Sequence, residues 1–347
     1  MVERLSFGIF GCGVIASTHA QAITSLPEAR LVAMADPAVE RARELSERFG
    51  GRVHGDLEEM LIDEDLDVVC VCTASGRHGE HACAVMRSGR HVIVEKPIEI
   101  RLDAIDEVLR VQRETGVKLS VISQHRFDPA VQRLHRLVQE DAFGRLVLAG
   151  AHVLWWRSQG YYDSGAWRGT RELDGGGVLM NQGIHSIDVL QWLMGPVDRV
   201  SAYAGTLAHT METEDTVVAA LRFRSGALGT IVGTTAAYPG VTTRLEIFGD
   251  HGSAIVERDR LRYLRLSSDG AEEVGAYGLE NEESGEPPAV EALSKGRSAH
   301  ALQIADMIRA IREDATPLVD GPAARHAVAI ILAIYRSAAE GRDVWLT

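Results

Sequence analysis

The chain has 347 residues, which is long for one domain and favours two. Its hydrophobic fraction of 46% and charged fraction of 24% are ordinary for a globular protein. The net charge of −13 offers no concentrated basic surface, so we expect neither nucleic acid nor an anionic membrane as a partner.

Membrane and export signals are not evident in the sequence. No apolar run reaches the roughly 20 residues of a membrane-spanning helix, and residues 1–6 lack the basic-then-apolar pattern of a secretory signal. The four cysteines show neither metal-ligand spacing nor a disulfide framework. We therefore expect a reduced, cytoplasmic protein without a bound metal.

The first predicted elements are a strand over residues 5–10, a glycine-rich turn, a helix over about 17–26 and a strand over 30–35. The turn consists of Gly11, Cys12, Gly13, Val14, Ile15 and Ala16. An acid, Asp36, follows about 20 residues later, as the dinucleotide-binding fingerprint requires. Gly11 permits the tight turn, Gly13 lets the backbone approach a pyrophosphate, and the helix N-terminus faces the phosphate charge.

Asp36 also indicates which dinucleotide is bound. A carboxylate there accepts hydrogen bonds from a ribose 2′-hydroxyl and repels a 2′-phosphate. The next residues are Pro37 and Ala38, whereas Arg41 and Arg43 come one helical turn later. NAD is therefore favoured, and NADP remains the less favoured alternative.

Strands and helices continue to alternate as far as residue 123, which predicts a doubly wound parallel sheet. Thr73, Ser75 and His78 follow one buried strand, and His78 is either a plain turn residue or a ligand contact. The strand over 91–94 leads into Glu95, Lys96 and Pro97. Because proline stops the strand, this charged pair lies at its carboxyl end, where open sheets of this kind hold their ligands.

After residue 123 the pattern changes to a helix over about 130–140 and long alternating strands. The strands are predicted near 145–156, 198–207, 215–224, 227–236, 242–248, 253–257 and 261–267. Two helices, at about 296–313 and 322–340, close the chain, and the acidic run 280–288 reads as a loop. We therefore predict two domains: residues 1–123 form a nucleotide-binding α/β domain, and residues 124–347 form an α+β domain with a large, mostly antiparallel open sheet.

One segment of the second domain carries polar residues on one side of a predicted helix. Three glycines at 175–177 precede Asn181, His185 and Asp188, which are spaced at i, i+4 and i+7. This spacing and the glycine run favour a functional site over a structural histidine. Tryptophan–arginine pairs at 156–157 and 167–168 lie upstream, and they either contact ligands or fill the joint between domains.

Together these motifs resemble the glucose-fructose oxidoreductase / inositol dehydrogenase (Gfo/Idh/MocA) family. The resemblance rests on GCGVIASTHA (11–20), Asp36, HVIVEKP (91–97), QHRFDPAVQRL (124–134) and the segment 167–193, and it covers nearly the whole chain. It implies an NAD(P)-dependent oxidoreductase acting on a sugar, cyclitol, sugar acid or nucleotide sugar. It also implies a homodimer or homotetramer joined through the open face of the second-domain sheet.

The resemblance further implies that Lys96 lies beside the reacting hydroxyl and that His185 relays the substrate proton. Asn181 stands where many members have aspartate; an amide cannot take up a proton, so it is expected to orient the substrate. The predicted cofactor contacts are Gly11, Gly13, Val14, Ile15, Asp36, Thr73, Ser75, His78, Glu95, Lys96, Gln124, Trp167 and Arg168. The predicted substrate contacts are Lys96, Arg126, Trp156, Arg168, Asn181 and His185.

Two other functions of the same fold remain open on the sequence. Relatives cleave glycosidic bonds with NAD and no net redox change, and others are non-catalytic sensors. Retention of Lys96 and His185 argues against a sensor. The arginines Arg157, Arg168 and Arg171 hint at an anionic substrate, but the sequence does not name it.

Overall fold

The computed structural model describes residues 4–267 and 298–346, so the acidic run 280–288 lies outside the described residues. Contacts divide the described chain into two compact units. The first holds residues 4–124, 165–176 and 298–329, and the second holds 125–164, 177–267 and 330–346. The predicted domains had a single boundary after residue 123 and did not foresee the two later segments of the first unit.

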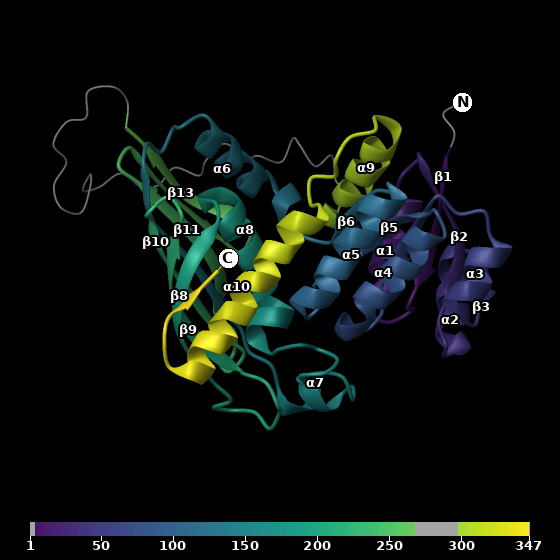
Figure 1. Cartoon of the computed structure of the whole chain (residues 1–347), viewed down its shortest axis with the longest axis horizontal. Coiled ribbons are helices and arrows are strands. Elements are labelled where there is room, and N and C mark those ends of the chain that lie inside the picture. Colours follow the sequence, from purple (N-terminus) through teal and green to yellow (C-terminus); the bar gives the residue numbers. More distant parts are fainter. Residues whose placement is uncertain (1–3, 268–297, 347) are drawn as a thin grey trace. The chain divides into compact units, whose positions relative to one another are not determined.

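The first unit is built on a six-stranded parallel sheet in the order β3-β2-β1-β4-β5-β6 (Figure 1). Its strands are β1 (Leu5–Phe10), β2 (Ala29–Ala35), β3 (Arg52–His54), β4 (Val68–Val71), β5 (His91–Val94) and β6 (Leu119–Val121). Every side chain of β4 is buried, as in a strand covered on both faces. The strand order reverses between β1 and β4, which is where such sheets bind ligands. The predicted doubly wound parallel sheet is confirmed.

The helices of the first unit pack on this sheet. They are α1 (Ala16–Thr24), α2 (Val39–Phe49), α3 (Leu57–Asp63), α4 (His78–Arg87), α5 (Leu102–Thr115) and α9 (Ala299–Arg312). Phe7 and Ile9 of β1 share one buried cluster with Ile304 and Met307 of α9. The sequence predicted α9 as a helix but placed it in the second domain, because an apolar helix face does not show which sheet it covers.

The second unit contains an eight-stranded sheet in the order β13-β12-β11-β7-β10-β9-β8-β14. Its strands are β7 (Leu146–Leu154), β8 (Val197–Gly205), β9 (Thr216–Phe223), β10 (Leu228–Thr234), β11 (Thr242–Gly249), β12 (Gly252–Glu257), β13 (Arg260–Leu266) and β14 (Val344–Trp345). All pairs are antiparallel except β7 with β10, so the predicted mostly antiparallel sheet is confirmed. The short strand β14 was not predicted, because two residues show no alternation.

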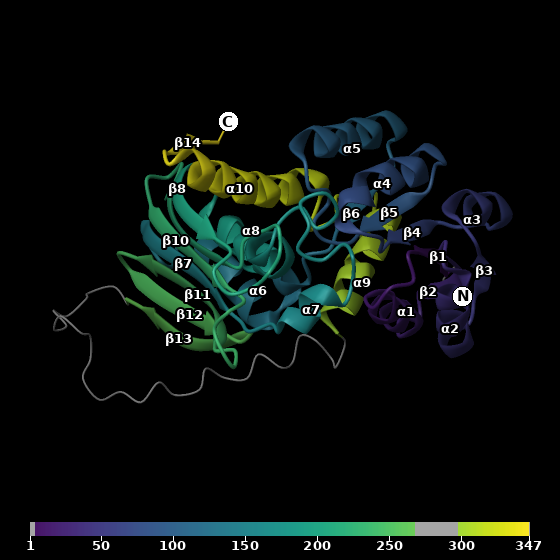
Figure 2. The same ribbon diagram turned by 90° about the horizontal axis from the view of Figure 1, so that it is seen from below.

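Helices α6 (Pro129–Gln139) and α8 (Ile184–Met194) lie on one side of this sheet (Figure 2). A π-helical turn over Val178–Gly183 leads into α8, where the sequence predicted a helix beginning near residue 182. The short helix α7 (Gln159–Asp163) and the long helix α10 (Gly321–Glu340) complete the fold. Within the described ranges, no helix combines the length and apolar character needed to cross a membrane.

Candidate active site

The two glycines of the turn after β1, Gly11 and Gly13, meet different requirements. Gly11 has φ +91°, and a Cβ there would lie 2.7 Å from the backbone of Cys72, so only glycine fits. A Cβ on Gly13 would meet no described atom within 4 Å. Gly13 is exposed and has no positive φ, so the fold does not require a glycine there. The space beside it is what a close approach of a pyrophosphate needs.

The N-terminus of α1 is suited to an anion. Its N-cap residue, Ile15, has no side chain able to cap the helix, and the first turn contains no acidic residue. The preceding Val14 is 87% exposed. The N–H groups of Ala16 and Thr18 donate to the Gly13 and Ile15 carbonyls, and the positive end of the helix dipole at this position attracts an anion, as in other phosphate sites.

Asp36 lies at the carboxyl end of β2 and is nearly buried. Its two oxygens accept hydrogen bonds from Cys12 N–H at 2.7 Å and from Ala38 N–H at 2.8 Å. The carboxylate therefore fixes the glycine turn, and each oxygen keeps a lone pair for a ribose hydroxyl. Gln124, which follows β6, has a buried Oε1 with no partner in the described part of the chain. Together these features fit a bound dinucleotide.

His78 begins α4 and joins two strand ends. It is 1% exposed, with Nδ1 2.6 Å from the Pro97 carbonyl and Nε2 3.0 Å from the Thr73 carbonyl. Burial lowers the pKa of His78. These contacts favour a structural role for His78 in the turn over a contact with a ligand. Ser75 lies in the adjacent turn and is also buried.

Lys96 follows β5 and is only partly exposed. Burial lowers the pKa of its amine, the charges of Glu95 and Asp174 oppose that change, and Arg168 adds to it. Arg168 stacks on Trp167 at 4.5 Å, and both belong to the segment 165–176 that packs with the first unit.

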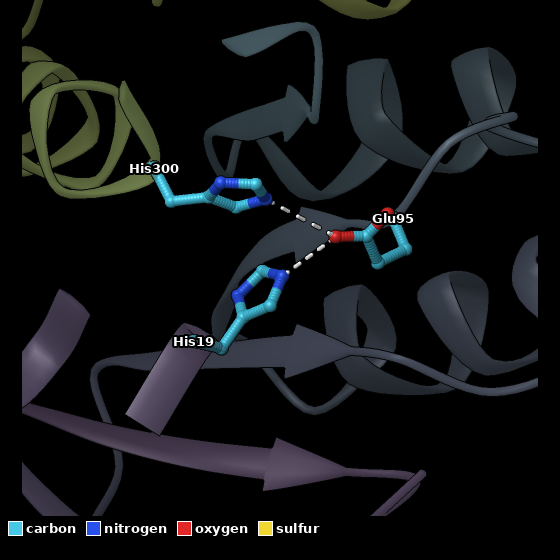
Figure 3. A group of neighbouring side chains, drawn as sticks. All are labelled: His19, Glu95 and His300. Carbon is cyan, nitrogen blue, oxygen red and sulfur yellow. Dashed lines mark hydrogen bonds and ion pairs between the residues drawn. The ribbon is translucent and has the colours of Figure 1, made fainter. Parts of the chain in front are cut away.

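Glu95, predicted to contact the cofactor, is buried. Its Oε1 accepts a hydrogen bond from His19 at 2.8 Å (Figure 3). Its Oε2 accepts one from the Lys96 N–H at 3.1 Å. No local pattern predicts that His19 and His300 lie around this carboxylate. His19 comes 76 residues before Glu95, and His300 comes far after it.

In the second unit, a buried carboxylate positions the turn that carries Asn181. Glu214 accepts hydrogen bonds from Gly177 N–H at 2.9 Å, Leu179 N–H at 3.1 Å and the Tyr335 hydroxyl at 2.8 Å. A Cβ on Gly177 would lie 1.8 Å from the Glu214 carbonyl oxygen. Gly177 thus permits a close approach of the backbone at Glu214.

His185 lines a cavity of about 300 Å³ within the second unit. Its lining includes the polar side chains of His125, Asp128, Gln182 and Asp259. The rings of His125 and His185 meet edge to face at 5.3 Å. The buried Oε1 of Gln182 has no partner among the described residues. Sequence reasoning did not assign these four residues, since they come from separate loops and helices.

Arg126 and Trp156, both predicted to contact the substrate, lie in different surroundings. Arg126 is 2% exposed, and its guanidinium pairs with both oxygens of Asp188 at 2.6 Å. It is better explained as a structural residue that joins the start of α6 to α8, and we do not carry it into the substrate site. Trp156 is 40% exposed and meets Tyr238 edge to face.

Comparison with known proteins identifies the family. Residues 5–123 match the oxidoreductase family with an NAD-binding Rossmann fold, and residues 131–255 match the GFO/IDH/MocA C-terminal domain. The WlbA dehydrogenase of Bordetella pertussis, solved with NADH and UDP-GlcNAcA, is 33% identical, with a TM-score of 0.89 over 99% of this chain and 98% of that one. The chain belongs to the Gfo/Idh/MocA family. It is an NAD-dependent oxidoreductase.

Other members of the Gfo/Idh/MocA family are similar over most of the chain. The myo-inositol 2-dehydrogenase of Thermotoga maritima is 29% identical over 82% of this chain and 90% of its own. The NAD-dependent scyllo-inositol 2-dehydrogenase of Bacillus subtilis is 26% identical over 77% of this chain and 78% of its own. These relatives oxidise hydroxyl groups of cyclitols, as their names state.

Proposed function

We propose that this protein oxidises a secondary hydroxyl of a sugar acid, linked to a nucleotide, with NAD as hydride acceptor. The observation that carries the proposal is Lys96, an amine of lowered pKa at the carboxyl end of β5 in an NAD-binding sheet. Bound NAD supplies the hydride acceptor, and the chain must supply a base for the hydroxyl proton.

Lys96 is the proposed base. A free lysine has a pKa of about 10.4 and is protonated at neutral pH, whereas a lysine of lowered pKa is neutral in a larger fraction of molecules. In the oxidation direction its neutral amine accepts the hydroxyl proton. In the reverse direction its ammonium returns that proton to the oxygen.

His185 and Asn181 are proposed to complete the chemistry. His185 borders the cavity in the second unit and serves to exchange the substrate proton with solvent. The Asn181 amide donates and accepts hydrogen bonds but does not titrate, so its proposed role is to orient the substrate.

The proposed anionic substrate is supported by charge and by similarity. Arg168 belongs to the same unit as Lys96 and acts on the charge of its amine. Arginine is the side chain best suited to pair with a carboxylate in two-point contact. The WlbA dehydrogenase, with an identity of 33%, was solved with UDP-GlcNAcA, whose name describes a sugar acid on a nucleotide.

NADH formation at 340 nm tests the proposal. UDP-GlcNAcA, UDP-GlcNAc, free sugar acids, inositols and free sugars are each supplied with NAD and with NADP. We expect the highest rate with UDP-GlcNAcA and NAD. NADH formation from free inositols or neutral sugars alone would overturn the proposed substrate class. Release of free sugar from glycosides without NADH would instead establish the glycoside-cleaving alternative.

We also propose that copies of the chain associate through the open face of the second-unit sheet. Tyr203, Val218 and Val232 are aligned across β8, β9 and β10, and Leu148 and Leu228 are aligned across β7 and β10. Four of these five side chains are large, apolar and exposed. An exposed apolar face of this kind is typical of protein interfaces. The cytoplasmic location remains a prediction.

A further inference from the structure

Glu95 is a buried carboxylate directly beside the proposed base. Its neighbours come from three elements that lie far apart in the sequence. His19 of α1 is 0% exposed and approaches Glu95 Oε1 to 2.8 Å, and His300 at the start of α9 approaches the same oxygen to 3.8 Å. The two imidazoles meet edge to face at 5.6 Å and point at this one oxygen (Figure 3).

The direction of the hydrogen bond between His19 and Glu95 follows from the geometry. Its Nε2 faces a carboxylate oxygen and must donate, whereas its buried Nδ1 has no partner within residues 4–267 and 298–346. An N–H buried without an acceptor is costly, so the favoured tautomer carries hydrogen on Nε2 alone. His19 is thus a hydrogen-bond donor to the Glu95 carboxylate.

The other oxygen of Glu95 connects the cluster to the catalytic position. Oε2 accepts a hydrogen bond from the backbone N–H of Lys96 at 3.1 Å, so the Glu95 carboxylate is held against the residue that carries the amine. Burial alone would raise the pKa of Glu95, but the contacts with His19 and His300 and the charge of Lys96 hold it well below the usual range. A negative charge is therefore kept in place where water is largely excluded.

We propose that Glu95, held by His19 and His300, is a positioning residue that sets the charge state of Lys96. The inference rests on the proposed role of Lys96 as the base. A fixed carboxylate close to an amine favours the ammonium, and the effect is stronger where water is excluded. Glu95 thereby keeps Lys96 able to regain a proton after each turnover, while burial keeps the neutral amine accessible.

The charges around this pair come from several elements. Asp174 and Arg168, from the segment 165–176, act on Lys96 in opposite directions. Around Glu95 lie the imidazole of His78 and the thiols of Cys70 and Cys72. Burial and the Glu95 charge both raise the pKa of each thiol, so the thiols stay neutral. Glu95 and Asp174 both favour the ammonium form of Lys96.

The test measures the ionisation of Lys96 directly. The purified full-length chain is labelled with trace acetic anhydride at a series of pH values from about 6 to 10, and acetylation of Lys96 is quantified by mass spectrometry. Lys118, whose amine pairs with Asp314, corrects for the reagent in the same sample. In Glu95→Gln we expect the midpoint of Lys96 labelling to fall by at least about one pH unit, a tenfold change in its proton affinity.

Glu99→Gln is the matched control. Glu99 is also buried and bonded to backbone N–H groups, at 3.0 Å from Gly79 and 2.6 Å from Ile100, but it is not among the charges that act on Lys96. The midpoint of Lys96 labelling in Glu99→Gln should equal that of the wild type. An equal fall in both variants, or no fall in a folded Glu95→Gln, would overturn the inference.

A second variant tests the inference if Glu95→Gln does not fold. His19→Leu removes the donor, so Glu95 takes up a proton more readily and the Lys96 midpoint falls in the same direction. An unchanged midpoint in this variant would contradict a role for the cluster. Because labelling does not depend on turnover, a failure to oxidise sugars leaves the result interpretable, and an unchanged midpoint leaves the dehydrogenase proposal standing.

Discussion

Gly11 and Gly13 stand two residues apart in one turn but meet different requirements. Gly11 is needed by the fold, because its positive φ and its contact with the Cys72 backbone exclude a side chain. Gly13 has open space beside it and an ordinary φ. A substitution at Gly13 therefore separates cofactor binding from folding.

Gly13→Ala should weaken NAD binding by about tenfold or more, because its methyl group keeps the pyrophosphate from the backbone and costs at least one hydrogen bond. The melting temperature without NAD should stay within about one degree of the wild type. Fluorescence titration with NADH and a thermal melt check the two expectations. Gly160→Ala on α7, whose Cβ would lie 3.7 Å from its nearest neighbour, is the control. Unchanged NADH affinity in Gly13→Ala would contradict the assignment of this turn.

The lowered pKa of Lys96 predicts how the kcat of oxidation and of reduction changes with pH. Oxidation requires the neutral amine, so its kcat should rise with pH and level off below the ordinary lysine value of about 10.4. Reduction requires the ammonium, so its kcat should fall through the same pH range. Steady-state rates in both directions with the same cofactor pair check this. An oxidation rate that falls as pH rises would exclude Lys96 as the base.

At the scale of single residues, the sequence predicted those whose place depends on a neighbouring strand. Gly11, Asp36 and Lys96 follow strands, and each strand was recognisable from its apolar run. Partners distant in sequence were not predictable. His19 and Glu95 lie 76 residues apart, and Arg126 and Asp188 lie 62 apart, so no local pattern links them.

At the scale of the elements, one buried ion pair holds the start of α6 against α8. Arg126, just before α6, pairs through two hydrogen bonds with Asp188 of α8, and the same guanidinium lies over the Trp192 ring at 5.1 Å. Both charges are buried, so removal of either deprives the other of the opposite charge in this pair. Arg126 was predicted to bind substrate, and a stability measurement distinguishes the two roles.

Arg126→Ala should lower the free energy of unfolding of the second unit by about 3–5 kcal/mol, because the Asp188 carboxylate stays buried without its partner. Urea unfolding followed by tryptophan fluorescence measures the loss. Arg136→Ala, an exposed position on α6, should change stability by less than about 0.5 kcal/mol. A stable Arg126→Ala with a raised KM would restore the original substrate assignment.

Most elements were predictable because their apolar residues repeat with the period of a strand or a helix. The segment 165–176 was predicted to belong to the second domain, but it packs with the first unit. This packing depends on contacts distant in sequence, such as the hydrogen bond from Gly76 N–H to the Leu173 carbonyl at 3.0 Å. The π-helical turn before α8 was also missed, since it is fixed by Glu214, which lies more than 30 residues later.

For the whole molecule, the open sheet face predicts association. Tyr203 is 84% exposed, and its cross-strand neighbour Val218 is 52% exposed. Trp345 of β14 lies at the same end of the sheet order, under the guanidinium groups of Arg199 and Arg222. Burying such side chains between copies contributes roughly 25 cal/mol for each Å² of apolar surface.

Val218→Glu should convert a dimer or tetramer to a smaller species, because it places a charge in the centre of the proposed interface. Size-exclusion chromatography with light scattering measures the mass. Ile62→Glu, at an exposed position on α3 of the first unit, should leave the mass unchanged. A monomeric wild type would contradict the proposed association. An unaltered mass in Val218→Glu would place the interface elsewhere.

The most direct test of Lys96 as the base is a single-turnover measurement of NADH formation with excess NAD-loaded protein and UDP-GlcNAcA. Lys96→Arg keeps the positive charge, but arginine does not deprotonate in proteins and cannot accept the hydroxyl proton. We predict stoichiometric NADH in the wild type and a rate at least about a hundredfold lower in Lys96→Arg, with NADH affinity retained. NADH formation at a comparable rate in Lys96→Arg would contradict the assignment of Lys96.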